Sequence, residues 1–164
     1  KHHRTGFHPT GQSATENQLE REYLQQSISQ NLGVKVELNT VGDYQMFANE
    51  RDNKNYDIFV GGWFSDYNDP LDFLNVMKTG VYDSYGLYSN SEYDSLIDSL
   101  TGENDNAKRL EIYQKLEDLL VAQDCGVAPL YYSDKHYYYQ NWVKDFYTSS
   151  FGASQELYRA SVQK

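Results

Sequence analysis

The sequence predicts an α/β fold, in which helices and strands alternate along the chain. Apolar residues recur at near-helical spacing over 15–33 and then alternate strictly over 34–38, which is the pattern of a helix followed by a half-buried strand. A second apolar run at 57–62 precedes several more helical stripes. This repeated order is typical of a layered α/β domain, in which ligands bind outside the carboxyl ends of the strands.

The composition indicates one acidic domain with a real core. A chain of 164 residues can bury roughly 70% of its unfolded surface. The 24 acidic and 14 basic residues give a net charge of −10, and such a surface repels phosphate backbones, so nucleic acid is not an expected partner. Aromatic residues reach 15%, with 16 Tyr, which suits both core packing and recognition of varied ligands.

Residues 1–14 read KHHRTGFHPTGQSA and show no periodicity, so they are predicted to be a flexible lead-in. The segment holds His2, His3 and His8 but no carboxylate partner, and we expect a terminus here and not a metal site. No cofactor is expected either. The first residue is Lys and no signal peptide precedes it, which favours a piece of a longer chain.

The first α/β unit can be bounded from local signals. Thr15 and Gln18 form a T-x-x-Q capping box that begins a helix, and Gly33 ends it. A half-buried strand covers 34–38, and a short amphipathic segment covers 44–50. The continuous apolar run at 57–62 predicts a central strand, which two glycines end abruptly.

Three more helices are expected. Asp69 and Pro70 form an N-cap and first-turn proline, Ser91 caps the next helix, and Asn104 or Asp105 begins a longer one that ends near residue 123. A strand is expected at 127–132, where Pro129 indicates its beginning or a sheet edge. The apolar stripes of the second and third of these helices are the predicted core: Tyr93, Leu96, Ile97, Leu100, Leu110, Tyr113, Leu116, Leu119 and Leu120. The lone Cys125 is expected to be a buried small hydrophobe.

Residues 61–74, GGWFSDYNDPLDFL, carry the groups that a peptide receptor needs. Glycines at a strand end allow close approach by another backbone, Trp63 offers a flat face, and Asp66 offers a carboxylate in a tight loop. A receptor that is indifferent to side chains must bind the main chain and neutralise the charged ends of a peptide. Asp69 is expected to be a helix cap, and Asp72 to stabilise the first helical turn.

The stretch YDIFVGGWFSDYNDPLDFLNVM resembles the motif D-I-x-x-x-G-W-x-A-D-Y-x-D/E-P-x-x-F-L of the oligopeptide-binding proteins, family 5 of the bacterial extracellular solute-binding proteins. Three further motifs are similar to those of the family in the same order: SEYDSLI at 91–97, the helix at 105–123, and APLYY at 128–132. These motifs cover roughly residues 16–135. The lead-in, however, lacks the apolar strand that the family usually has there.

The resemblance implies an α/β lobe of the type II periplasmic-binding-protein kind, with a mixed sheet flanked by helices. It implies that Asp66 pairs with the amino group of a peptide, and that Gly62, Trp63 and Phe64 line the cleft. Aromatic cleft residues of the family fall at Tyr131 and Tyr132. On this basis residues 15–133 form the carboxyl-terminal lobe, and residues 134–164 form a return segment that packs on an amino-terminal lobe.

The resemblance also implies the biological setting. The chain is expected to be part of the substrate-binding component of an ABC importer for oligopeptides, which captures a peptide outside the cytoplasm and delivers it to the permease subunits. It is expected to be a monomer, to have no catalytic residues, and to reach a membrane only through an upstream lipid anchor.

Two alternatives remain open. The same family scaffold serves receptors for sugars, nickel complexes and signalling peptides. A glycoside hydrolase that uses Asp66 and Asp69 is an alternative from the enzyme class. Two carboxylates three residues apart, across a loop and a helix cap, are poorly placed to flank a glycosidic bond, so we expect a binding protein and not an enzyme.

Overall fold

A computed structural model describes residues 2–7, 14–39, 44–81, 87–132, 136–149, 151 and 155–163. The chain divides into two compact units, Lys1–Trp63 and Phe64–Lys164, and each is described here by itself. Among the described residues, no helix combines the length and the apolar character that crossing a membrane requires.

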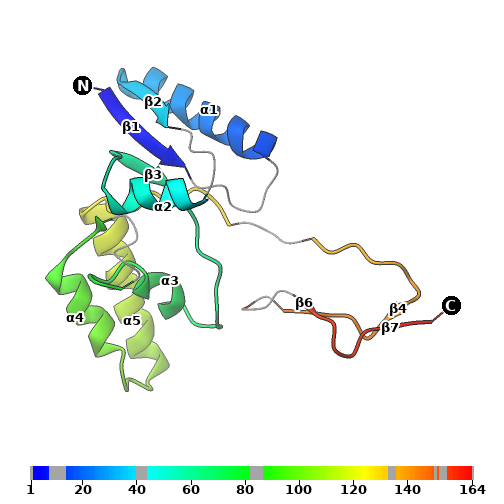
Figure 1. Ribbon diagram of the computed structural model, residues 1–164. Helices are drawn as coiled ribbons and strands as arrows, with labels where there is room; N and C mark the ends of the chain where they lie inside the picture. The colour runs from blue at the N-terminus through cyan, green and yellow to red at the C-terminus, as the bar shows by residue number, and fades with distance from the viewer. Residues whose placement is uncertain are drawn as a thin grey trace. The chain divides into compact units, whose positions relative to one another are not determined.

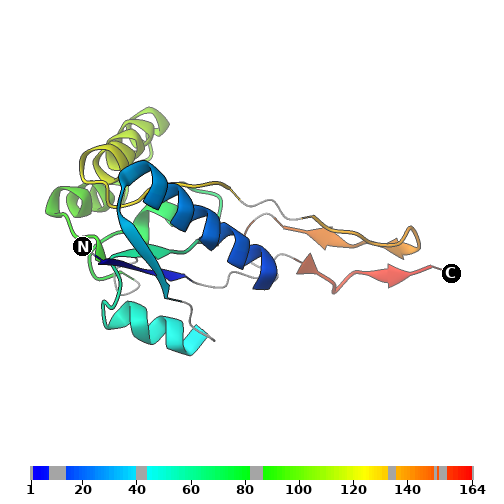
Figure 2. The same ribbon diagram turned by 90° about the horizontal axis from the view of Figure 1, so that it is seen from above.

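The first unit contains a three-stranded parallel sheet with the order β2-β1-β3. Its strands are β1 (His2–Phe7), β2 (Lys35–Asn39) and β3 (Ile58–Val60), connected by α1 (Ala14–Leu32) and α2 (Tyr44–Asp52) (Figure 1). The chain extends the sheet first on one side of β1 and then on the other. Because parallel crossovers are right-handed, this reversal sends the two helices to opposite faces, and Figure 2 shows α1 and α2 on either side of the strands. The predicted α/β class is confirmed, although this sheet is parallel throughout and not mixed.

The prediction of a flexible lead-in is wrong over His2–Phe7, which form the central strand of the sheet. Its backbone pairs with both neighbours, for example His3 with Val36 and Gly6 with Phe59. The ladder hydrogen bonds are made by the main chain, so HHRTGF can pair on both sides although it lacks the apolar run that is typical of a central parallel strand. As a consequence β3, predicted to be central, is an edge strand among the described residues. The remainder of the predicted lead-in, up to residue 13, lies outside the described residues.

The first predicted helix and strand are confirmed, with one correction at the start. Because α1 begins at Ala14, Thr15 lies inside the helix and the predicted capping box is not its boundary. Gly33 adopts a left-handed φ of 65°, and its N–H donates to the Ser29 carbonyl at 3.0 Å, as the predicted stop requires. In β2, Val36 is buried while the residues on either side of it are exposed, which confirms the alternation.

The second unit is built on helices. They are α3 (Leu71–Asn75), α4 (Ser91–Ser99) and α5 (Asn106–Glu117), which continues into the π-helical segment η2 (Asp118–Gln123) (Figure 1). The Tyr93 hydroxyl donates to the Leu74 carbonyl at 2.8 Å and so joins α4 to α3. The buried core of this unit is Leu74, Val76, Met77, Tyr88, Tyr93, Ile97, Leu100, Tyr113, Leu116, Leu119 and Leu120. This confirms most of the predicted stripes, whereas Leu110 is exposed and Leu96 only half-buried.

Side-chain caps begin two of these helices. Asn90, one residue before the predicted Ser91, accepts hydrogen bonds from the backbone N–H groups of Glu92 and Tyr93 at 2.8 and 3.2 Å. Asp105 caps α5 as predicted, since its carboxylate accepts from Ala107 and Lys108. The missed cap follows from the similar capping ability of Asn and Ser.

The segment after η2 departs from the sequence prediction. Cys125 is exposed and has a φ of 51°, so the expected buried cysteine is wrong. Residues 127–132 have no ladder partner within the described residues and are not a strand, and Pro129 could not donate to one. Beyond them, two short antiparallel pairs form: β4 (Val143–Lys144) with β7 (Ser161–Val162), and β5 (Tyr147–Thr148) with β6 (Gln155–Glu156).

Candidate ligand-binding site

The two glycines at the end of β3 have different roles. A Cβ atom on Gly61 would lie 2.6 Å from Cζ of Phe59, so Gly61 makes room for that ring, which packs against Tyr56 with centroids 5.7 Å apart. A Cβ atom on Gly62 would meet nothing within 4 Å. The space beside Gly62 is therefore open, whereas the space beside Gly61 is filled by the Phe59 ring.

Gly62 and Trp63 follow the carboxyl end of a parallel strand in a sheet whose order reverses at β1. Ligands of open α/β sheets bind at this end of the strands. Trp63 is half-buried, so its ring can both pack and present a face. The carboxyl end of β3, where the sequence predicts a site, is thus a position of the kind at which such ligands bind.

Asp66 lies in the loop that leads to α3, with its side chain exposed. Its backbone N–H donates to Oδ2 of Asp72 at 2.8 Å, and the neighbouring Ser65 hydroxyl donates to the Tyr67 carbonyl at 2.5 Å. The loop is therefore tied by its backbone while the carboxylate faces solvent. Phe64, in the same stretch, is exposed as well.

Asp72 has a feature that the sequence does not indicate, namely the burial of its carboxylate. It lies in the first turn of α3, as expected, but it is only 6% exposed, and it is the one charged side chain that is buried among the residues whose burial the structure describes. Buried carboxylates require hydrogen-bond partners, and the Asp66 amide is one of them. No pattern in the sequence indicates this burial, because the partner of the carboxylate is a main-chain N–H.

Asp69 is fully engaged in holding the helices together. Its Oδ1 accepts from the Leu71 N–H at 2.8 Å and from the Tyr113 hydroxyl at 2.6 Å, and its Oδ2 accepts from Nη2 of Arg109 at 2.8 Å. Burial alone would raise the pKa of Asp69, but the hydrogen bonds from Tyr113 and Leu71 and the charge of Arg109 together lower it. Burial and the Asp69 carboxylate raise the pKa of Tyr113 to about 12.

This network bears on the hydrolase alternative. A glycosidase needs one carboxylic acid with a raised pKa to protonate the leaving group. The pKa of Asp69 is instead lowered, and both of its carboxylate oxygens accept hydrogen bonds from other parts of the fold. Asp69 is therefore poorly suited to be the general acid of a glycosidase.

Tyr131 and Tyr132 lie in the extended stretch after η2 and are 57% and 94% exposed. They belong to the same unit as Phe64 and Asp66, whereas Gly62 and Trp63 belong to the first unit. The structure brings Asp66 together with Asp72.

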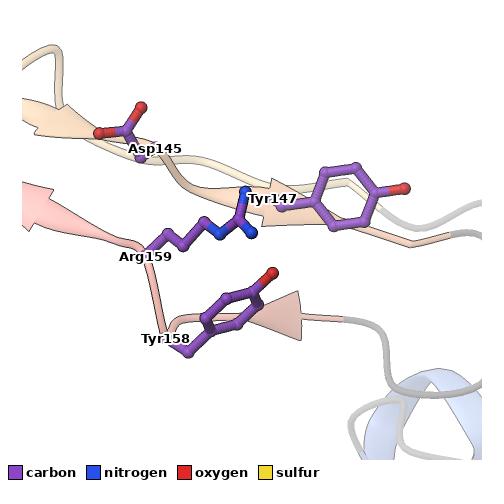
Figure 3. A pocket seen from close by; sticks show the side chains of 4 residues that line it. All are labelled: Asp145, Tyr147, Tyr158 and Arg159. Atoms are coloured by element: carbon purple, nitrogen blue, oxygen red, sulfur yellow. The ribbon is translucent and has the colours of Figure 1, made fainter.

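A shallow hollow of about 260 Å³ lies elsewhere, in the segment of short strand pairs, lined by Asp145, Tyr147, Tyr158 and Arg159 (Figure 3). The guanidinium carbon of Arg159 is 5.1 Å from the centroid of the Tyr158 ring. The hollow contains none of the predicted site residues. Among the described residues, no group of three or more His, Cys, Asp or Glu side chains could hold a metal ion.

Comparison with protein families gives a match to the bacterial extracellular solute-binding proteins, family 5 (middle region), over residues 6–84. The oligopeptide-binding protein OppA of Bacillus subtilis (strain 168) is 32% identical over 124 residues, which are 74% of this chain and 21% of that protein. The periplasmic oligopeptide-binding protein OppA of Salmonella typhimurium (strain LT2) is 32% identical over 113 residues, which are 69% of this chain and 20% of that protein. The chain thus spans about a fifth of the length of these relatives.

A solved structure agrees with the sequence matches. The substrate-binding domain of an oligopeptide ABC transporter from Bacillus anthracis superimposes with a TM-score of 0.82 and 26% identity, covering 99% of this chain and 31% of that one. Because it covers 99% of this chain, the superposition extends over residues of β1, the strand that sequence patterns did not indicate. With the order of motifs, the sheet topology and these relatives in accord, the chain belongs to family 5 of the bacterial extracellular solute-binding proteins.

Proposed function

We propose that this chain is part of the solute-binding component of an ABC importer for oligopeptides, and that Asp66 binds the amino end of the peptide. The observation that carries the proposal is the state of Asp66: its carboxylate is exposed while its backbone is tied to a buried residue. Relatives that are named oligopeptide-binding proteins support the ligand class. The protein is proposed to bind and to catalyse no reaction.

The proposed recognition uses what all peptides share. Gly62 is exposed and has open space beside it, which would let a peptide main chain approach closely. Trp63, Phe64, Tyr131 and Tyr132 offer aromatic surface that does not discriminate between side chains. An ammonium about 4 Å from the Asp66 carboxylate gains roughly 4 kcal/mol at an effective dielectric of 20, before the cost of desolvation. One aspartate is therefore enough to favour a free amino end.

The rest of the receptor completes the cleft in this proposal. This chain covers about a fifth of its curated relatives, and the opposite wall comes from the remaining parts. A peptide that contacts both walls selects the closed form, because only that form satisfies both sets of contacts. Residues 134–164 would pack on the second lobe, and the closed receptor would dock on the permease outside the cytoplasm.

The test is calorimetric titration of the complete receptor with short peptides and with the same peptides acetylated at the amino end. Asp66→Asn should weaken binding of the free peptides by about 2–4 kcal/mol, the usual cost of leaving one half of a charge pair, and should leave binding of the acetylated peptides nearly unchanged. Glu111→Gln, which removes an exposed charge from α5, is the matched control and should change neither.

Each contrary result has a defined meaning. Unchanged affinity of Asp66→Asn would remove Asp66 from the site while leaving a peptide receptor. Failure of the unmodified receptor to bind either peptide set would point to one of the other solutes that the scaffold serves, such as a sugar or a nickel complex.

A further inference from the structure

We propose that Asp72 is a positioning residue for Asp66, acting through a hydrogen bond to the Asp66 backbone and without touching the ligand. This inference rests on the proposed function, because it assigns a supporting residue to the same site. The family motif D-Y-x-D/E-P-x-x-F-L leaves position 72 unspecified, so the motif itself assigns no role to Asp72.

Burial is the first step of the argument. Asp72 is 6% exposed on a helix of only five residues, where a small polar or apolar residue would fill the space at lower cost. A buried carboxylate is retained only where hydrogen bonds compensate its lost hydration. The bond from the Asp66 N–H at 2.8 Å has the length of a strong, charge-assisted bond.

The second step is what that bond controls. It closes a seven-residue loop from Asp66 to Asp72, and inside the loop the Asp69 N–H donates to the Tyr67 carbonyl at 3.0 Å. Restraining the amide of Asp66 restrains the peptide plane that carries its Cα, and so narrows the range of directions that its Cα–Cβ bond can take. The exposed carboxylate then searches a smaller volume than it would on a free loop.

The third step is that hydrogen bonds to neighbouring helices hold the segment that contains Asp72. Its own N–H donates to the Asp69 carbonyl at 3.0 Å, and the Asp69 carboxylate is held by Arg109 and Tyr113 of α5. Further along α3, the Leu74 carbonyl accepts from Tyr93 of α4. The contacts with α4 and α5 therefore hold Asp72 in place, and Asp72 in turn restrains the loop that carries Asp66. Support of this kind keeps a binding group in a productive position.

The experiment measures how strongly the complete receptor distinguishes a free amino end from an acetylated one. A pentapeptide retained by the unmodified receptor is first selected from a randomised pentapeptide library, and the ratio of its Kd in acetylated and free forms is then determined for each variant. Asp72→Ala removes the acceptor. Asp72→Asn removes the charge but keeps an acceptor oxygen.

Asp94→Ala is the matched control. The Asp94 carboxylate also accepts a loop backbone N–H, from Thr79 at 3.0 Å, but it lies outside the loop that carries Asp66. Its loss should cost stability of a similar kind and leave the ratio unchanged.

Asp72→Ala should lower the ratio at least tenfold, while Asp72→Asn and Asp94→Ala should stay within about twofold of the unmodified receptor. An unchanged ratio in folded Asp72→Ala, or an equal loss in Asp72→Ala and Asp72→Asn, would overturn the positioning role and leave the proposed function standing. If the unmodified receptor retains no peptide, or shows no preference for the free amino end, the assignment of Asp66 fails and this inference fails with it.

Hydrogen exchange of the Asp66 amide in the unmodified receptor tests the bond even if Asp72→Ala does not fold. The amide should exchange at least tenfold more slowly than in an unstructured peptide. Exchange at the unstructured rate would overturn the proposal.

Discussion

Asp66, Asp69 and Asp72 are spaced three residues apart, yet their carboxylates have three different surroundings. That of Asp66 is exposed, that of Asp69 is shared with Arg109 and Tyr113, and that of Asp72 is buried. Three aspartates of one segment thus have three proposed roles: Asp66 binds the ligand, Asp69 joins helices, and Asp72 positions Asp66. Substitutions at the three sites should accordingly affect different properties.

A methyl group added at Gly126 should lower the stability of the fold, because it would overpack a close contact. A Cβ atom there would lie 2.6 Å from Cδ2 of Tyr88 and 3.1 Å from Cδ1 of Leu120, whereas one on Gly62 would meet nothing within 4 Å. Overpacking of this kind usually costs about 1–3 kcal/mol. Thermal unfolding of the complete receptor should therefore show a lower midpoint for Gly126→Ala and little change for Gly62→Ala. Equal midpoints would contradict the close packing of Tyr88 on this backbone.

Local chemistry made some of these residues predictable. Asp69 before Pro70 has the signature of a helix start, and its carboxylate accepts from the N–H of Leu71, the first residue of α3. The N-cap residue, however, is Pro70 and not Asp69 as predicted. Asp72 could not be read in the same way, because its partner is a main-chain N–H and its burial results from the packing of three helices. The prediction that Cys125 is buried failed for a related reason. It was based on apolar neighbours in the sequence, which do not indicate the left-handed φ of 51° or the exposure of this residue.

The Asp69 carboxylate joins α3 to α5, and this link should depend on pH. Since the folded-state pKa of Asp69 is lowered, its contribution to stability is fully present above the unfolded pKa of about 3.9 and is lost as the pH falls through the folded value. Asp69→Asn should reduce the unfolding free energy at pH 7 by about 1–3 kcal/mol.

The deficit of Asp69→Asn should shrink as the pH falls below about 4, because the unmodified carboxylate is protonated first in the unfolded state and then, at its lowered pKa, in the folded state. Urea unfolding at pH 7 and pH 3 measures both parts, with Glu111→Gln as the charge control. A deficit that is the same at both pH values would mean that the ion pair with Arg109 contributes nothing.

Helices were more predictable than strands in this chain. The apolar residues of α4 and α5 recur at helical spacing within each helix, so the pattern is local in the sequence. Asp105 indicates where α5 begins, and its side chain caps that helix. β1 gave no such signal, because a central parallel strand is held by pairing with β2 and β3, and those partners are far away in sequence. The converse error at 127–132 has the same origin: an apolar run with β-propensity is no strand without a neighbour to pair with.

The return segment exposes an unusual amount of aromatic surface for a folded chain. Tyr138 is 93% exposed, and Tyr139, Trp142, Tyr147 and Tyr158 are exposed as well. Large exposed apolar patches mark interaction sites. This supports the proposal that residues 134–164 pack on the remainder of the receptor.

Chemical nitration of tyrosine tests that proposal. Tyr138 should react readily in the isolated chain and at least tenfold more slowly in the complete receptor, because packing on a second lobe would cover it. Tyr93, which is fully buried in the second unit, should be unreactive in both and serves as the internal reference. Equal reactivity of Tyr138 in the two proteins would show that the segment stays exposed.

The central place of β1 also has a consequence for the order of folding. Its two partners come later in the chain, and the last of them, β3, ends at Val60, so the sheet cannot be completed until this whole stretch has been synthesised. Pairing between distant segments carries a loop-closure cost and slows folding, whereas the helix pair α4 and α5 depends on nearby contacts. The helical unit should therefore be able to fold rapidly, while the sheet that carries Gly62 and Trp63 forms slowly and leaves an unpaired strand open to aggregation in the meantime.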